Sequence, residues 1–173
     1  MITRRNFLKS CLIGASLFSF HNAFASAATD RMLTMEHIHT GEHLNIRYCS
    51  SGIYDDEALA TINYFLRCHY TNRVMPIDIR VLDLLCDIRD CTGTKNPLQI
   101  VSGYRSDIYN DKLIREGRNV SKTSLHLRGC AIDFTIEGFS NRRLARIAQS
   151  FKAGGVGRYP EFVHIDVGRV RSW

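Results

Sequence analysis

Two histidines and one aspartate offer the nitrogen and oxygen ligands that zinc prefers, although they are far apart in the chain. His126 and Asp133 lie in the segment 124–133, and His164 lies in the segment 161–166 near the C-terminus. Zinc binds neutral imidazole nitrogen and carboxylate oxygen, and a catalytic site keeps a fourth position for water. The three residues are a chemically sufficient ligand set, and we predict that they bind one zinc ion.

Strand periodicity supports this prediction, because it directs two of the three side chains to one side of a sheet. Apolar residues alternate over 130–136, so they share one face and Asp133 points to the other. The same alternation over 162–167 separates His164 from the apolar face. Two neighbouring strands would direct both side chains towards one point, with His126 in the loop before the first strand. From spacing alone, structural or solvated roles remain the alternative.

Hydrophobic patterns along the rest of the chain predict the elements that must support this site. Segments 31–39 and 43–48 are predicted to form a hairpin, and segment 98–101 a buried strand. Amphipathic spacing and end signals predict four helices, at 57–70, 77–91, 107–117 and 141–152. We therefore predict an α+β fold.

Three motifs in order resemble the periplasmic murein endopeptidase K family, which belongs to the zinc D-Ala-D-Ala metallopeptidase superfamily. The resemblance covers roughly residues 46–173. The motifs are Ser102-Gly103-Tyr104-Arg105-Ser106 followed by Asn110, then Ser124-x-His126-x-x-Gly129-x-Ala131-x-Asp133, then Phe162-Val163-His164-x-Asp166-x-Gly168-Arg169. The resemblance implies a hedgehog-like or DD-peptidase-like fold, in which a small antiparallel sheet carries the zinc site and packs against several helices. It also implies an endopeptidase that opens peptidoglycan cross-links.

The resemblance also assigns catalytic candidates. Arg105 would steady the negative charge that builds on the scissile carbonyl during peptide hydrolysis, and a structural salt bridge is the alternative. A carboxylate must accept the proton of the attacking water. Asp166 shares a face with His164 if the strand is regular, and Glu161 lies three residues before His164, as in the wider superfamily. Both carboxylates remain candidates, with Asp166 preferred, and orienting a ligand histidine is the alternative role for Asp166.

Two further residues are candidates for substrate binding. Ser124 precedes His126 by two residues and is predicted to bind substrate, to orient the ligand or to form a turn. Tyr159 follows a glycine-rich stretch at 154–157 and is predicted to line the groove or to pack. No Gly-x-Ser-x-Gly elbow and no phosphate-binding glycine motif occurs, which disfavours serine hydrolase and nucleotide chemistry.

Composition limits the other classes of function. A chain of 173 residues with 45% hydrophobic residues fits one globular domain, which we place at 28–173. The net charge is +6, and it falls to +3 without the three basic residues of the first 27. That mild surplus, without a basic helix or an aromatic-rich strand, does not indicate a nucleic-acid partner.

The first 27 residues are predicted to be an export signal. Thr3-Arg4-Arg5 and Phe7-Leu8-Lys9 resemble a twin-arginine motif, and an apolar run at 11–20 precedes small residues suited to cleavage. The run is too short for a comfortable membrane span. We therefore predict twin-arginine export to the periplasm, with the export machinery as partner of the precursor and no stable span in the mature protein.

Cysteine and histidine patterns outside the motifs are less specific. Five cysteines follow the signal, so at least one must be free, and Cys86 and Cys91 are close enough in sequence to pair. Cys130 is predicted to be a small buried side chain. The histidines at 37, 39 and 43 are candidates for a second metal site, but the preferred interpretation is that they lie on a solvated face of the hairpin.

The sequence therefore predicts a zinc peptidase that acts on peptidoglycan stem peptides or their cross-links. A carboxypeptidase that trims a terminal residue is the alternative enzyme. A non-catalytic cell-wall-binding module on the same fold is the alternative from another class.

Overall fold

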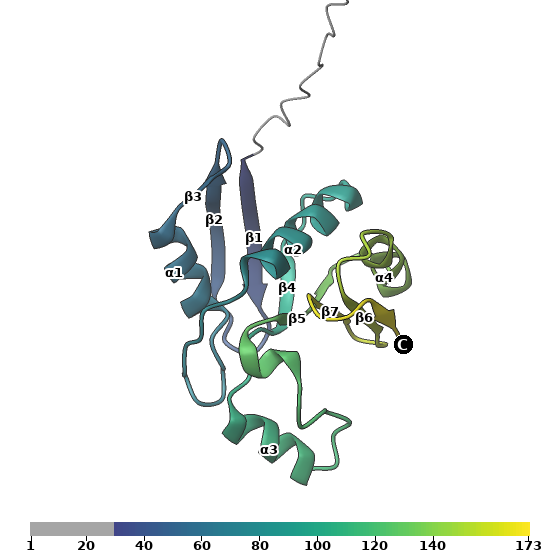
Figure 1. The fold of residues 1–173 in the computed structure, drawn as a ribbon. Helices are drawn as coiled ribbons and strands as arrows, with labels where there is room; N and C mark the ends of the chain where they lie inside the picture. Colours follow the sequence, from purple (N-terminus) through teal and green to yellow (C-terminus); the bar gives the residue numbers. More distant parts are fainter. Residues whose placement is uncertain (1–29) are drawn as a thin grey trace, which may run out of the picture.

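The computed structural model describes residues 30–173, in which an eight-stranded sheet packs against helices (Figure 1). The predicted signal at 1–27 and the first two residues of the predicted domain lie outside the described residues. The strands are β1 Arg31–His37, β2 His43–Ser50, β3 Ile53–Tyr54, β4 Leu98–Ser102, β5 Ala131–Ile136, β6 Gly155–Arg158, β7 Val163–Asp166 and β8 Arg171–Ser172. The helices are α1 Asp56–Phe65, α2 Ile79–Thr92, α3 Asp107–Arg115, α4 Asn141–Ser150 and the 3₁₀ helix η1 Leu125–Arg128.

The sheet has the order β3-β2-β1-β4-β5-β7-β6-β8 and confirms the α+β class. It is larger than the predicted small sheet, and it is mixed, because β1 pairs with β4 and β6 pairs with β8 in parallel. The strands next to the predicted zinc site are antiparallel, since β5 pairs in that sense with β4 and with β7. The predicted hairpin of β1 and β2 is confirmed.

One hydrophobic core lies between the sheet and three helices. Strand residues such as Ile100, Phe134 and Ile165 are fully buried, and they pack against apolar residues of α1, α2 and α4. Figure 1 shows α4 beside β6 and β7 at the C-terminal end of the sheet, with α3 below the strands. Because side chains alternate along a strand, the polar residues between these apolar ones point to the opposite face.

Three of the four α-helices begin at a side-chain cap, whereas Ser140 before α4 makes no capping hydrogen bond. Asp55 accepts backbone N–H bonds from two residues of α1, Asp78 caps α2, and Ser106 caps α3. These caps satisfy amide groups that have no partner inside the helix. No helix among residues 30–173 is long and apolar enough to cross a membrane.

A tight turn at Gly129 links the end of η1 to β5. Gly129 has φ of +65°, and a Cβ there would lie 2.3 Å from the carbonyl oxygen of Pro76. Its carbonyl also accepts the N–H of Asp78 at 2.9 Å. Only glycine tolerates both this conformation and this approach, so the turn that carries η1 is fixed against the segment preceding α2.

Candidate functional site

The structure brings the three predicted metal ligands together. Asp133 on β5 and His164 on β7 are direct partners in the antiparallel pairing of their strands. His126 reaches them from η1. Asp133 Oδ1 lies 2.8 Å from His164 Nδ1 and 3.2 Å from His126 Nε2, and the two ring nitrogens are 3.2 Å apart. The three residues form the one group of potential metal ligands of this kind in the described part of the chain.

Local structure fixes the orientation of His126. The Ser124 hydroxyl accepts the backbone N–H of His126 at the start of η1. His126 Nδ1 lies 2.7 Å from the carbonyl oxygen of Gly103, which can only accept a hydrogen bond. Nδ1 therefore carries the proton, and the unprotonated Nε2 faces Asp133 and His164.

His164 is held on its other side by Asp166. His164 Nε2 lies 3.1 Å from Asp166 Oδ2, so that nitrogen donates and Nδ1 faces the cluster. Asp166 is fully buried, and its oxygens accept five hydrogen bonds in all. The donors are His164 Nε2, the backbone N–H groups of Gly155 and Gly168, and both terminal nitrogens of Arg171.

Burial and charged neighbours shift the pKa values of these four residues in different directions. Burial lowers the pKa of His126 despite the neighbouring Asp133 carboxylate. Burial also opposes protonation of His164, but its bonds to Asp133 and Asp166 outweigh that effect and raise its pKa to about 9. Burial opposes ionisation of the two carboxylates, yet their hydrogen bonds and charged neighbours lower both pKa values.

This arrangement fits a zinc ion. Two nitrogens and one oxygen, all from buried or half-buried residues, point towards one another. These three atoms lie 2.8 to 3.2 Å apart. Ligand atoms bound tetrahedrally at about 2.0 Å from zinc are separated by about 3.3 Å, so small shifts suffice. The second nitrogen of each histidine is already bound to a carbonyl or a carboxylate, as metal-ligating histidines require.

Arg105 lies beside these ligands. Its side chain is buried, its Nη2 is 3.6 Å from Asp133 Oδ2, and its Nη1 donates to Asn110 Oδ1 at 3.4 Å. The Nε of Arg105 has no hydrogen-bond partner among the described residues. Asn110, which follows the first of the three family-like motifs, therefore contacts Arg105 rather than the candidate ligands.

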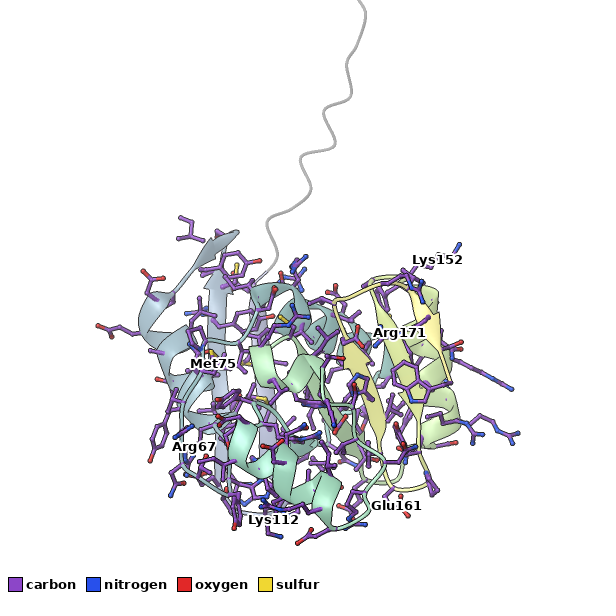
Figure 2. The ribbon with its side chains drawn as sticks, turned by 60° about the horizontal axis from the view of Figure 1, so that its bottom comes forward. Arg67, Met75, Lys112, Lys152, Glu161 and Arg171 are labelled. Atoms are coloured by element: carbon purple, nitrogen blue, oxygen red, sulfur yellow. The ribbon has the colours of Figure 1, made fainter. Side chains whose placement is uncertain are left out.

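A pocket of about 510 Å³ opens over the cluster. Its lining includes the predicted substrate-binding residues Ser124 and Tyr159 and the three candidate ligands, together with Arg105 and Asp166. Glu161 is exposed and does not line the pocket. Figure 2 shows Glu161 at the edge of the molecule, well away from Arg171. Of the two candidate proton acceptors, the structure places only Asp166 in the pocket.

Sequence patterns did not identify two residues at this pocket. Arg171 binds Asp166 through both terminal nitrogens, at 2.7 and 3.1 Å, and no motif signal distinguishes it from other surface arginines. Trp173 is 51% exposed and lines the pocket, and it belongs to none of the three motifs. Its ring lies against Gly157, where a Cβ would approach it to 2.7 Å, and its Nε1 donates to the Tyr159 hydroxyl at 2.9 Å.

The remaining cysteines and histidines take no part in this site. All five described cysteines are free, so Cys86 and Cys91 do not pair, and Cys130 is half-buried rather than buried. His37 is buried against Phe65 instead of lying on a solvated face, whereas His43 is exposed. These residues form no further metal-ligand group in the described part of the chain.

The chain is similar to known peptidoglycan endopeptidases over most of its length. Residues 25–173 match the family model described as peptidoglycan L,D-endopeptidase MepK. The chain is 41% identical over 155 residues to the peptidoglycan L,D-endopeptidase MepK of Escherichia coli strain K12, covering 87% of this chain and 85% of that protein. It is 34% identical over 154 residues to the probable peptidoglycan L,D-endopeptidase MepK of Haemophilus influenzae, covering 87% and 83%. No solved structure gives a significant match.

Proposed function

The chain belongs to the MepK family of peptidoglycan L,D-endopeptidases. We propose that it is a zinc-dependent enzyme that hydrolyses peptide cross-links of peptidoglycan during cell-wall remodelling. The observation that carries the zinc dependence is the convergence of His126, Asp133 and His164 in one pocket. A bound zinc ion supplies Lewis acidity and acidifies water at this position. The chain's other residues bind and orient the substrate around it.

Arg105 is the proposed stabiliser of developing charge. Peptide hydrolysis moves negative charge onto the scissile carbonyl oxygen, and a fixed cation beside that oxygen lowers the barrier. The Arg105 guanidinium lines the pocket next to Asp133 and is held there by Asn110. Ser124 and Tyr159 are the proposed contacts for the peptide on either side.

Asp166 is proposed to position His164 rather than to accept the water proton. Its five hydrogen bonds occupy both carboxylate oxygens, and its pKa is lowered, whereas an efficient base has a pKa near the working pH. Through His164 Nε2 it directs the Nδ1 lone pair to the ligand cluster.

The proposed location is the periplasm, where peptidoglycan is accessible. The twin-arginine motif at 3–9 supports export of an already folded domain with its metal site formed. The mature enzyme would begin near residue 28.

The proposal is tested by digesting purified cross-linked muropeptides and identifying products by mass spectrometry. The protein should cleave the cross-link between the two stem peptides of each dimer, lose this activity with a chelator, and regain it with stoichiometric zinc. An endopeptidase releases two monomers from each dimer, whereas a carboxypeptidase releases single amino acids. Unchanged cleavage in the chelated protein, or no cleavage with zinc, contradicts the proposal.

Changing Asp166 to asparagine should weaken zinc binding about 10- to 100-fold, because the amide no longer holds His164 in the ligand tautomer. The matched variant is Glu161→Gln, which removes the other candidate carboxylate from an exposed position outside the pocket. Its zinc affinity and kcat should stay within about twofold of the parent. Zinc affinity is measured by competition with a fluorescent chelator, and kcat on the muropeptide dimer. A large loss of kcat in Glu161→Gln would contradict this expectation and would make Glu161 the acceptor of the water proton.

A further inference from the structure

A second pocket, of about 240 Å³, lies behind the C-terminal tryptophan and is rich in arginine. Two of its arginines come from α4 and one from the strand β6, and Figure 1 shows the helix α4 beside this strand. The lining residues are Arg142, Ala145, Arg146, Gln149, Arg158, Ser172 and Trp173.

The positive charge of this pocket is uncompensated. The side chains of Arg142, Arg146 and Arg158 make no hydrogen bond or ion pair with any described residue, and α4 contains no acidic residue. Arg142 and Arg146 are also four residues apart on the helix, a spacing at which like charges destabilise. By contrast, Arg67 and Arg171 are each bound to a carboxylate. Three free guanidinium groups around one hollow favour an anionic ligand there.

Trp173 separates this pocket from the proposed metal site and lines both. Its ring centroid is 5.4 Å from that of His164, and the guanidinium carbon of Arg171 lies 4.9 Å from the ring centroid. A chain that leaves the metal site across the exposed tryptophan would therefore enter the arginine pocket.

We propose that the pocket of Arg142, Arg146 and Arg158 is a subsite for the carboxylates of an acidic stem peptide, on the part of the substrate remote from the scissile bond. This inference rests on the proposed function and names the part of the substrate that the known motifs do not contact. Guanidinium groups bind carboxylates through paired N–H donors, and an exposed aromatic ring carries the intervening aliphatic segment. The subsite suits a cross-linked substrate, because a second stem peptide brings carboxylates beyond the cleaved bond.

Binding can be measured without hydrolysis by the fluorescence of Trp173, because Trp173 is the only tryptophan of the chain. The probe is the free stem tripeptide Ala-γ-Glu-diaminopimelate, and the comparison is the same peptide with its carboxylates amidated. The double variant Arg142→Gln and Arg146→Gln should raise the Kd of the free tripeptide about tenfold, which corresponds to about 1.4 kcal/mol. Amidation should weaken binding to the parent protein by a similar factor, with little further effect in the double variant.

Arg143→Gln is the matched control. Arg143 lies on the same helix and carries the same charge, but it packs over the Phe139 ring outside the pocket lining. Its Kd should stay within about twofold of the parent. If the control loses as much affinity for the tripeptide as the double variant, the effect comes from net charge alone and the subsite is overturned. Equal affinity of the parent for the free and the amidated peptide would also overturn it. The double variant is also tested for binding to phosphatidylglycerol vesicles. If it loses affinity for the vesicles but keeps its affinity for the tripeptide, the subsite is overturned in favour of a lipid surface.

Cleavage assays keep this inference separate from the proposed function. If the parent binds the tripeptide through these arginines but cleaves no dimer, the subsite stands and the proposed function fails. If it cleaves dimers and the double variant has an unchanged KM, the function stands and the subsite fails. The expected result is a KM for the dimer raised about tenfold with kcat unchanged.

Discussion

Replacing His126 by alanine should abolish dimer cleavage and zinc-dependent stabilisation together. His126 would supply one of the three proposed ligand atoms, and its Nε2 lies 3.2 Å from both of the others. Two remaining ligands hold zinc poorly, so the Lewis acidity worth several kcal/mol of barrier is lost. Since each 1.36 kcal/mol corresponds to a factor of ten, kcat/KM should fall about 10³-fold or more. Mass spectrometry of digests and zinc content of the purified protein measure both effects.

The stability readout separates loss of the ion from loss of the fold. Zinc at 100 times its Kd should stabilise the parent by about 2.7 kcal/mol, which a thermal melt detects, and should not change the melting temperature of the variant. Metal-free parent and variant are compared directly, because removing a buried ring itself costs stability. His43→Ala is the matched control, since His43 is exposed on β2. Zinc-induced stabilisation of the His126→Ala variant would show that the ion binds elsewhere.

Periodicity alone could predict how the side chains of two candidate ligands, Asp133 and His164, are placed. Alternation assigns Asp133 and His164 to the faces opposite their apolar neighbours, and the structure pairs the two residues directly across β5 and β7. A period of two is a local property, so a short segment is enough to read it. The position of His126 is different, because it depends on η1 and on the carbonyl of Gly103, which is distant in sequence.

The helix ends show where local signals fail. The first helix was predicted to continue to residue 70, but α1 ends at Phe65, where the Leu66 carbonyl accepts the N–H of Tyr104 at 2.8 Å. The second was predicted from residue 77, but α2 begins at Ile79 because Asp78 is its cap and is bonded to the Gly129 turn. In both cases a contact with a segment near the site, far along the chain, decides the boundary.

The last two strands at one end of the sheet, β6 and β8, and Arg171 illustrate a second limit. β6 reads Gly-Val-Gly-Arg and β8 has two residues, so neither carries a hydrophobic alternation long enough to predict a strand. Both form because β7 already offers an edge with which β6 pairs, and β6 then offers one to β8. Arg171 lies on β8 and binds Asp166 as a consequence of that pairing. Its role could be found only from coordinates.

Changing Arg105 to lysine should lower kcat about 10²- to 10³-fold while zinc remains bound. Removing one donor that stabilises an oxyanion typically costs this much, and lysine keeps the charge but not the planar guanidinium that contacts Asn110 and approaches Asp133. Kinetics at saturating dimer measure kcat, and chelator competition measures zinc affinity, which should change less than about threefold. A structural salt bridge would instead cost stability and leave kcat intact.

Arg67→Lys provides that structural comparison within the same protein. Arg67 is also buried, and it binds both oxygens of Glu42 at 2.9 and 3.1 Å, remote from the pocket lining. The substitution should lower the melting temperature and leave kcat within about twofold, because it disturbs a paired guanidinium that contacts no substrate. The two lysine variants should therefore show opposite patterns of stability and kcat. If Arg105→Lys gives the pattern expected of Arg67→Lys, Arg105 is a structural residue and charge stabilisation must come from elsewhere in the pocket.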